Sequence, residues 1–344
     1  MPVVDVHAHA AIPQADALLT RFPEFLDQLR EDAATAGAAS SEYNRTQIAA
    51  LTPSLTEPAL RIQAMDAAGI DVQAVSATPI PRHWLDEQTA AEFTGATNDG
   101  LAAHCSYAPD RLAVVASVAL HHPSVAIAEL TRAVEELGAI GVQISTSAGR
   151  GRELDDSAFD LFWAGAVDLD VPVLIHPWGC TLGERLDVGY MFNHVGNPTE
   201  TSVALSRLIF GGVLDRFPAL RIWGAHGGGW LPSYSGRADH AWEQREDART
   251  CLRHPSQYLR EMWVDSLVYT PEALHHLVTA MGSTHVTIGT DYPFDMGVDN
   301  PLERLAEAGL SANEVDEIGS WSALALFGPR FASITGEIAG GTRA

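Results

Sequence analysis

Lysine is absent from this chain of 344 residues, so all 21 of its basic residues are arginine. The absence excludes Schiff-base catalysis, which needs a lysine amine. It also excludes a carboxylated lysine that bridges two metal ions. Any metal site in this protein is therefore expected to hold one ion.

Cysteine is scarce, and long apolar runs are missing. The three cysteines, Cys105, Cys180 and Cys251, form no Cys-x-x-Cys pair and cannot all pair with one another, which fits a reducing compartment. No segment reaches the roughly 18 consecutive apolar residues of a membrane span. The sequence starts on a β-branched run rather than on a secretory signal. We therefore expect a cytoplasmic protein.

Positively charged residues are also few. The 44 acidic residues outnumber the arginines, and the formal net charge is −23. Such an excess of acid argues against nucleic acids and anionic membranes as partners. Hydrophobic residues make up 46% of the chain, which is enough for a sizeable core.

Short β-branched runs alternate with amphipathic stretches along most of the chain. The predicted strands are Val3–Val6, Val72–Ser76, Leu112–Ser117, Gly141–Ile144, Val171–Ile175, Arg221–Gly224, Met262–Asp265 and Val286–Gly289. Stretches between them, such as Thr201–Phe210 and Pro271–Met281, carry apolar residues at helical spacing. Eight strands with intervening helices predict one (β/α)8 TIM-like barrel over residues 1–335, followed by a tail at 336–344.

The segment Ala11–Thr56 interrupts this alternation. It is long, mixes polar and apolar residues, and precedes the first helix of the barrel type, Glu57–Ala68. We expect it to be an insertion after the first strand that caps the mouth of the barrel.

Metal-ligand side chains follow four of the predicted strands. The first strand leads into His7 and His9, which point to the same side because alternate residues of a strand do so. The fifth leads into His176, the sixth into His226 and the eighth into Asp291, the only carboxylate that we place at this ring of strand ends. Barrel enzymes keep their chemistry at the C-terminal ends of the strands, so these side chains are expected to meet.

Imidazoles with one carboxylate are the ligands of a divalent transition metal. They favour Zn²⁺, and Mn²⁺, Fe²⁺ or Co²⁺ also suit them. His226 is followed by Gly227–Gly229, which allow a backbone or a ligand to approach closely. This histidine could bind the metal or stand beside it as an acid or base.

Three motifs together resemble those of the amidohydrolase superfamily. They are HPW at 176–178, AHGGG-x-x-P-x-x-x-GR at 225–237 and GTDYPF at 289–294. Within the superfamily, they are most similar to the decarboxylase branch that contains the 2-amino-3-carboxymuconate-6-semialdehyde decarboxylase family. The resemblance runs from His7 to about Phe327.

The resemblance implies a site and a reaction. His7, His9, His176 and Asp291 would bind one Zn²⁺ (or Mn²⁺) per subunit, and Asp291 would also handle protons. His226 would be the general base that activates a zinc-bound water. The implied reaction is the non-oxidative decarboxylation of an aromatic or muconate-like carboxylic acid, without a redox cofactor, pyridoxal phosphate or flavin.

The resemblance also implies which residues bind the substrate. Arg237 matches an arginine that reaches into the neighbouring subunit's site, which implies a homodimer, and Arg45 is expected to bind a carboxylate as well. The planar guanidinium suits a carboxylate because it can bind it through two parallel hydrogen bonds. Trp178 and Phe294 lie within the matching motifs and are expected to contact the substrate.

The chain departs from that family after the HPW motif. The family has an acidic residue there and pocket tryptophans further on, whereas this chain has Gly179 and a more polar stretch with Tyr190, Asn193 and His194. A different aromatic or muconate-like acid would therefore fit as well as the semialdehyde. A hydrolase of the same superfamily, acting on a lactone, an amide or a C–C bond, is the alternative function. A metal-binding barrel without catalysis is a third reading.

Overall fold

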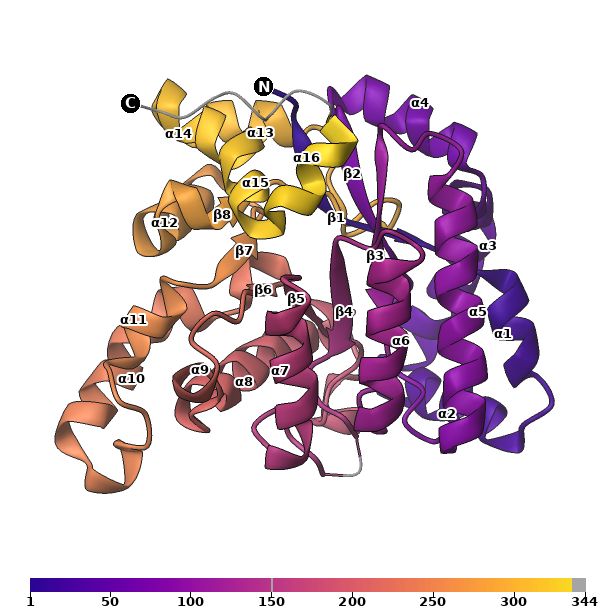
Figure 1. Cartoon of the computed structure of the whole chain (residues 1–344), viewed down its shortest axis with the longest axis horizontal. Coiled ribbons are helices and arrows are strands. Elements are labelled where there is room, and N and C mark those ends of the chain that lie inside the picture. Colours follow the sequence, from indigo (N-terminus) through magenta and orange to yellow (C-terminus); the bar gives the residue numbers. More distant parts are fainter. Residues whose placement is uncertain (150, 336–344) are drawn as a thin grey trace.

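The computed structural model describes residues 1–149 and 151–335, so the predicted tail at 336–344 lies outside the described residues. Eight parallel strands follow one another around a single sheet in the order of the chain, with helices between them (Figure 1). The strands are β1 (Val4–Ala10), β2 (Val72–Ala77), β3 (Leu112–Ser117), β4 (Gly141–Ser145), β5 (Val173–His176), β6 (Ile222–Gly224), β7 (Trp263–Asp265) and β8 (Val286–Thr287). The predicted (β/α)8 barrel is confirmed.

The helices account for most of the remaining chain. They are α1 (Pro13–Leu19), α2 (Pro23–Ala36), α3 (Ala38–Thr56), α4 (Pro58–Ala68), α5 (Glu87–Cys105), α6 (Pro123–Glu135), α7 (Asp160–Asp168), α8 (Asn197–Phe210), α9 (Val213–Arg216), α10 (Leu231–Gln244), α11 (Pro255–Leu259), α12 (Pro271–Met281), α13 (Pro301–Glu307), α14 (Ala312–Asp316), α15 (Ser322–Phe327) and α16 (Pro329–Thr335). Within the described ranges, none of them combines the length and the apolarity that crossing a membrane requires.

Contacts between β1 and the segment that follows β8 close the barrel. The N–H of Asp291 donates to the carbonyl of His7 (2.8 Å), and the N–H of His9 donates to the carbonyl of Tyr292 (2.8 Å). The buried carboxylate of Asp5 accepts hydrogen bonds from the N–H (3.0 Å) and the hydroxyl (2.6 Å) of Thr290. These contacts hold Asp291 beside the two histidines of β1.

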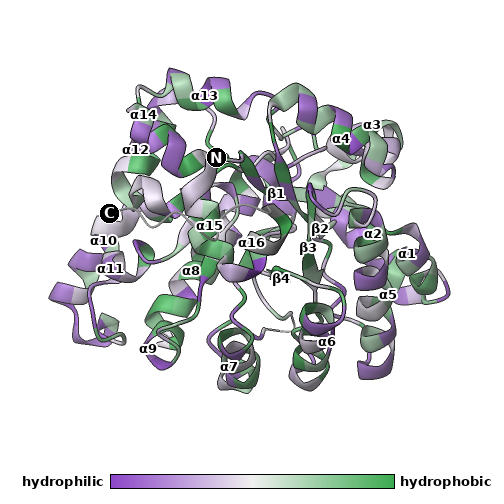
Figure 2. Cartoon of the chain, turned by 45° about the horizontal axis from the view of Figure 1, so that its top comes forward, coloured by the Kyte–Doolittle hydropathy of each residue, from purple (hydrophilic) through white to green (hydrophobic). Residues whose placement is uncertain are grey.

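The C-terminal helices close one end of the barrel. Phe327 and Phe331 of α15 and α16 pack with Trp223 and with apolar strand residues such as Val6 in one buried cluster. Figure 2 shows these helices over the centre of the ring, next to the N-terminus. The hydroxyl of Ser320 also donates to the carbonyl of Pro2 (2.7 Å). The end at which the strands start is therefore filled, and the C-terminal ends of the strands lie opposite.

The insertion predicted at Ala11–Thr56 forms α1, α2 and α3. Helix α2 contacts two loops at the C-terminal end of the barrel. Gln28 of α2 donates to the carbonyl of Pro81 after β2 (2.7 Å), and Asp32 accepts a hydrogen bond from the indole N–H of Trp178 after β5 (3.3 Å). The helix thus connects loops from separate parts of the mouth.

The buried side chain of Arg61, on α4, forms hydrogen bonds that hold the C-terminal end of β1 in place. Its guanidinium donates to the carbonyl of His9 (2.5 Å), to the side-chain oxygen of Gln73 (2.7 Å) and to Nε2 of His104 (3.0 Å). Burial, together with the charge of Arg61, lowers the pKa of His104 to about 4, so this imidazole stays neutral and can accept the hydrogen bond. Arg61 therefore has a structural role.

Candidate metal centre

Four side chains from two strands, β1 and β5, and from the loop after β8 converge at the C-terminal end of the barrel. His7, His9, His176 and Asp291 are buried, and one ligand atom from each lies within 4.8 Å of all the others. Nε2 of His7 is 3.1 Å from Nε2 of His9 and 3.0 Å from Nε2 of His176. Nε2 of His9 is 3.2 Å from Oδ1 of Asp291. The structure brings together all four residues that the sequence analysis assigned to the metal.

The outer nitrogen of each of these histidines has its own acceptor. Nδ1 of His7 lies 2.7 Å from a carboxylate oxygen of Asp265. Main-chain carbonyl oxygens lie 3.2 Å from Nδ1 of His9 and 2.8 Å from Nδ1 of His176. Acceptors at Nδ1 favour the tautomer in which Nδ1 carries the proton and Nε2 has a lone pair. The three lone pairs then point at one another.

This arrangement fits a divalent cation. Lone pairs at such distances repel, and Oδ1 of Asp291 is buried without a hydrogen-bond donor among the described residues. The three separations of 3.0–3.2 Å are close to the spacing of about 3.3 Å between neighbouring ligands of a small divalent ion with bonds of about 2.0–2.1 Å. Burial and the neighbouring histidines hold the pKa of His176 well below its usual range. Burial opposes ionisation of Asp291, but its contacts with His226 and His9 hold its pKa well below the usual range too. Neutral imidazoles and an anionic carboxylate are the protonation states that bind metal.

His226 stands next to the cluster. Its Nε2 lies 3.6 Å from Oδ2 of Asp291, and its ring centroid lies 5.3 Å from that of His7 and 5.1 Å from that of His176. His226 and Asp291 both have a φ of 56°, in the left-handed region that non-glycine residues seldom adopt. Such strain costs about 1–3 kcal/mol per residue and clusters at functional sites.

Asp265, the last residue of β7, links the cluster to His226. Besides its contact with His7, its carboxylate accepts hydrogen bonds from the main-chain N–H groups of His226 (2.8 Å), Gly227 (2.8 Å) and Leu267 (3.0 Å). The prediction that Asp291 is the only carboxylate at this ring of strand ends is therefore wrong. The signal was present, because Asp265 ends the predicted strand Met262–Asp265.

Glycines allow the close packing around these residues. A Cβ on Gly289 would lie 2.6 Å from Cβ of Asp265 and 3.1 Å from Cβ of His7. Gly229 has a φ of 66°, and a Cβ there would lie 2.3 Å from the carbonyl oxygen of Pro198. After His226, glycine is thus required because the backbone at Gly229 lies close to the backbone at Pro198.

One aromatic side chain, Phe294, lies beside the cluster. The ring of Phe294 is half-buried, with its centroid 5.5 Å from that of His9. Trp178 is half-buried as well, and its indole points to Asp32 of the cap. In the polar stretch after the HPW motif, burial and the charges of Asp295 and Asp291 raise the pKa of Tyr190.

Comparison with known proteins agrees with this geometry. A model of the amidohydrolase family matches residues 4–328. The chain belongs to the amidohydrolase family.

The relatives of this amidohydrolase include named decarboxylases. The chain is 36% identical to 2-amino-3-carboxymuconate-6-semialdehyde decarboxylase of Dictyostelium discoideum over 244 residues, which cover 70% of this chain and 68% of the relative. It is 30% identical to gamma-resorcylate decarboxylase of Rhodococcus jostii over 287 residues, which cover 78% and 86%. Its fold matches the crystal structure of 5-carboxyvanillate decarboxylase from Novosphingobium aromaticivorans with bound manganese and a nitrobenzoic acid, with a TM-score of 0.82, 26% identity and coverage of 95% and 97%.

The two predicted substrate-binding arginines lie elsewhere in the subunit. Arg45 is on the exposed side of α3, where it pairs with Glu42 (2.5 Å). Arg237 is exposed on α10. Nothing in the described part of the chain joins either arginine to the four-residue cluster, so their binding roles stay predictions.

Proposed function

We propose that this amidohydrolase is a metal-dependent, non-oxidative decarboxylase of an aromatic or muconate-like carboxylic acid. One observation carries the proposal: a buried set of His7, His9, His176 and Asp291, with His226 beside it, lies in a chain whose named relatives remove CO₂ from unsaturated or aromatic acids.

The four clustered residues would hold one divalent ion. Their donor set favours Zn²⁺, and Mn²⁺ also suits it, as in the manganese-bound structural neighbour. Bound there, the ion supplies Lewis-acid chemistry that polarises a substrate oxygen or activates water. Phe294 and Trp178 would form apolar walls for the ring or diene of the substrate.

His226 would move the proton. The carbon that carries the carboxylate gains one proton, its bond to the carboxylate breaks, the electron pair of that bond stays on the carbon, and CO₂ leaves. Nε2 of His226 faces Oδ2 of Asp291, so a proton on this nitrogen is stabilised by the carboxylate. Asp265 fixes the backbone of His226 and thereby the direction of its ring.

Isotope incorporation tests the reaction. The metal-loaded protein is incubated in D₂O with aromatic and muconate-type acids, beginning with 2,6-dihydroxybenzoate, and the products are analysed by mass spectrometry. We expect loss of CO₂ with one deuterium at the vacated carbon. A chelator should abolish the reaction, and added Zn²⁺ or Mn²⁺ should restore it.

The same experiment separates the alternative hydrolase. Hydrolysis leaves the elements of water in the product, whereas decarboxylation adds only one hydrogen. If the acids persist while lactones or amides gain water, the decarboxylase proposal is wrong.

We further propose a homodimer in which Arg237 reaches the neighbouring subunit's site. Tyr234 and Arg237 are three residues apart on α10 and share a face, and Trp230 is exposed just before this helix. Trp230 also lines a groove with Val203 and Phe210 of α8. Exposed tryptophan, tyrosine and arginine are typical of interfaces, which supports this surface as the contact between subunits.

Mixed dimers test the role of Arg237. Arg237→Ala and His226→Ala subunits should each be inactive alone. Mixing them by reversible denaturation should restore about a quarter of the wild-type activity, because half of the dimers are mixed and each mixed dimer has one complete site. If Arg237 served its own subunit, the mixture would stay inactive.

A further inference from the structure

The insertion that contains α1, α2 and α3 leaves the barrel and returns to it at one point. The main-chain N–H of Ala11, just after β1, donates to the carbonyl of Leu55, near the end of α3 (3.1 Å). Leu55 is buried, and Pro53 interrupts the helical hydrogen bonds just before it, because proline has no N–H. A segment that is joined to the body at neighbouring residues can turn about that joint, as a hinged element does.

The first helix of the insertion belongs to the body of the barrel, whereas the other two are loosely attached. Helix α1 buries Ala15 and Leu19, and Leu19 packs with Leu85 after β2. Helices α2 and α3 are described over their whole length, and Ala36 and Leu55 are their only buried residues. Helices are held to a body mainly by the burial of an apolar face, so α2 and α3 have much less to hold them than α1 has.

The face of α2 that meets the barrel is polar. Gln28 and Asp32 lie one turn apart on this face and are half-buried. The side-chain amide of Gln28 makes three hydrogen bonds with the segment after β2. Its Nε2 donates to the carbonyl of Pro81 (2.7 Å), and its oxygen accepts from Nη1 of Arg82 (2.9 Å) and from the indole N–H of Trp84 (2.8 Å). One glutamine therefore joins α2 to the end of β2.

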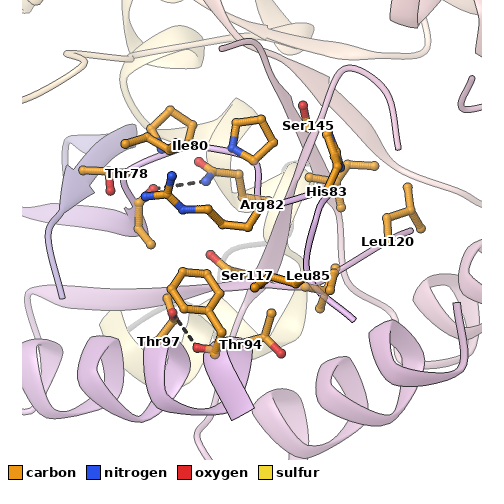
Figure 3. A pocket seen from close by; sticks show the side chains of 18 of the residues that line it. Thr78, Ile80, Arg82, His83, Leu85, Thr94, Thr97, Ser117, Leu120 and Ser145 are labelled. Atoms are coloured by element: carbon orange, nitrogen blue, oxygen red, sulfur yellow. Dashed lines mark hydrogen bonds between the residues drawn. The ribbon is translucent and has the colours of Figure 1, made fainter. Parts of the chain in front are cut away.

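This contact lies beside open space. Figure 3 shows the side chain of Arg82 extended across a cavity of about 100 Å³ that Ile80 and Leu85 also line. Hydrogen bonds between polar groups can be exchanged for hydrogen bonds with water, so breaking them costs little net free energy when water can enter. The attachment of α2 at Gln28 is therefore of a kind that can be made and broken reversibly.

Asp32 joins the same helix to the candidate metal centre. Its carboxylate accepts a hydrogen bond from the indole N–H of Trp178 (3.3 Å). Trp178 comes two residues after His176, whose Nδ1 lies 2.8 Å from the carbonyl oxygen of Pro177. Because β2 and β5 are three strands apart in the ring, α2 spans part of the mouth between them. A movement of α2 therefore breaks its contact with the segment that carries a candidate metal ligand.

We propose that α2 and α3 form a lid, which turns about residues 20–22 and Pro53 and which Gln28 and Asp32 latch in the closed position. In the open position both latches are broken, Trp178 is released and the mouth is free for a substrate to enter. The admission of a substrate rests on the proposed function, whereas the movement of the lid does not.

Fluorine NMR of the metal-loaded protein, labelled with 5-fluorotryptophan, tests the lid at its two latches. Among the eight tryptophans, Trp84 donates to Gln28 and Trp178 donates to Asp32, and phenylalanine substitutions assign their two signals. Gln28→Leu should shift the Trp178 signal and enlarge its isotope shift between H₂O and D₂O, although the indole bond that it removes is that of Trp84. Asp32→Ala should change the Trp84 signal in the same way. These reciprocal changes are expected because a lid opens at both latches together.

Gln47→Leu is the matched control, because Gln47 donates to Tyr43 within α3 and does not latch the lid. Both signals should stay unchanged in this variant. The signal of Trp163, buried in α7, should stay unchanged in every variant. If each latch variant changes only the tryptophan next to it, α2 does not move as one body and the lid is wrong. The two latch variants are independent, so either one decides the question if the other fails to fold.

Stopped-flow binding shows whether the lid controls access to the site. Benzoate serves as the ligand, since it has no hydroxyl or amino group to assist the loss of CO₂. In the wild type, the observed rate should level off at high benzoate concentration, because the lid must open first. The plateau should be about 10-fold higher in Gln28→Leu, as expected for the loss of the hydrogen bonds that keep the lid closed. Rates that rise linearly with the same slope in both proteins would overturn the control of access by the lid.

The lid and the proposed reaction can fail separately. If benzoate does not bind and no acid is decarboxylated, but the reciprocal NMR changes occur, the proposed function is wrong and the lid stands. If acids are decarboxylated and the reciprocal changes are absent, the lid is wrong and the reaction stands.

Discussion

Replacement of His226 by alanine is expected to lower kcat by about 10²- to 10⁴-fold while the protein keeps one metal ion per subunit. The expected separation of rate from metal content follows from the geometry. His226 lies outside the set of four converging ligand atoms, and its Nε2 instead faces Oδ2 of Asp291 at 3.6 Å. The measurement is kcat together with metal content by plasma mass spectrometry. Exogenous imidazole should restore part of the rate, because the substitution leaves room where the ring was.

His240→Ala is the matched control for this experiment. His240 is exposed on α10, downstream of the same loop, and its loss should change neither rate nor metal content. Loss of metal from His226→Ala would make His226 a ligand, and full activity would remove it from the mechanism. A rate loss with bound metal and imidazole rescue is the pattern that only a proton-transferring group gives.

The strands were predictable because parallel strands are buried on both faces and so read as short β-branched runs. The residues at which the strands begin and end were harder to predict. The pairing of β1 with β2 continues to Ala10 opposite Ala77, so His7 and His9 lie inside a strand predicted to end at Val6. The last strand is shorter than predicted, although single bridges continue its pairing with β1.

Helices were predicted best where the apolar period begins at the first turn. Pro271–Met281 is observed with the predicted bounds. Helix α8 begins four residues before the predicted Thr201, at Asn197, where a proline in the first turn starts the helix ahead of the apolar pattern. The spacing of apolar residues marks the buried face of a helix. Residues of the first turn often lie outside this apolar pattern, so the spacing does not predict where the helix begins.

The candidate ligands could be read from the sequence because their residue types and their places after strands coincide. Asp265 met the same criterion at the end of β7 but carries no motif of its own. The contacts of the buried Arg82 could not be predicted in this way. Gln28, more than fifty residues away, accepts a hydrogen bond from Nη1, and only the packed structure shows that Nε has no acceptor among the described residues. Contacts of this kind are decided by tertiary packing.

Replacement of Asp265 by asparagine is expected to weaken metal binding by about 10- to 100-fold, although Asp265 contacts no ligand atom that faces the cluster. The carboxylate accepts a hydrogen bond from the N–H at Nδ1 of His7, so that Nε2 carries a lone pair. An asparagine with its oxygen toward Gly227 and Leu267 would place its NH₂ group against Nδ1 of His7 and against the N–H of His226. Nδ1 would then have to accept, and the proton would move to Nε2, where it blocks ligation. Competition with a metal indicator measures the affinity.

The same substitution should also affect His226, because its main-chain N–H loses an acceptor and meets a donor. We therefore expect kcat to fall even at saturating metal, by a factor that adding Zn²⁺ or Mn²⁺ does not recover. Asp66→Asn, at an exposed carboxylate paired with Arg111, is the matched control and should leave both affinity and rate unchanged. If Asp265→Asn bound metal normally and lost rate only, the carboxylate would serve His226 alone. If it lost affinity but regained full rate at saturating metal, it would serve His7 alone. Loss of both would show that one carboxylate positions a metal ligand and the proton-transferring histidine together, which is the role that its four hydrogen bonds describe.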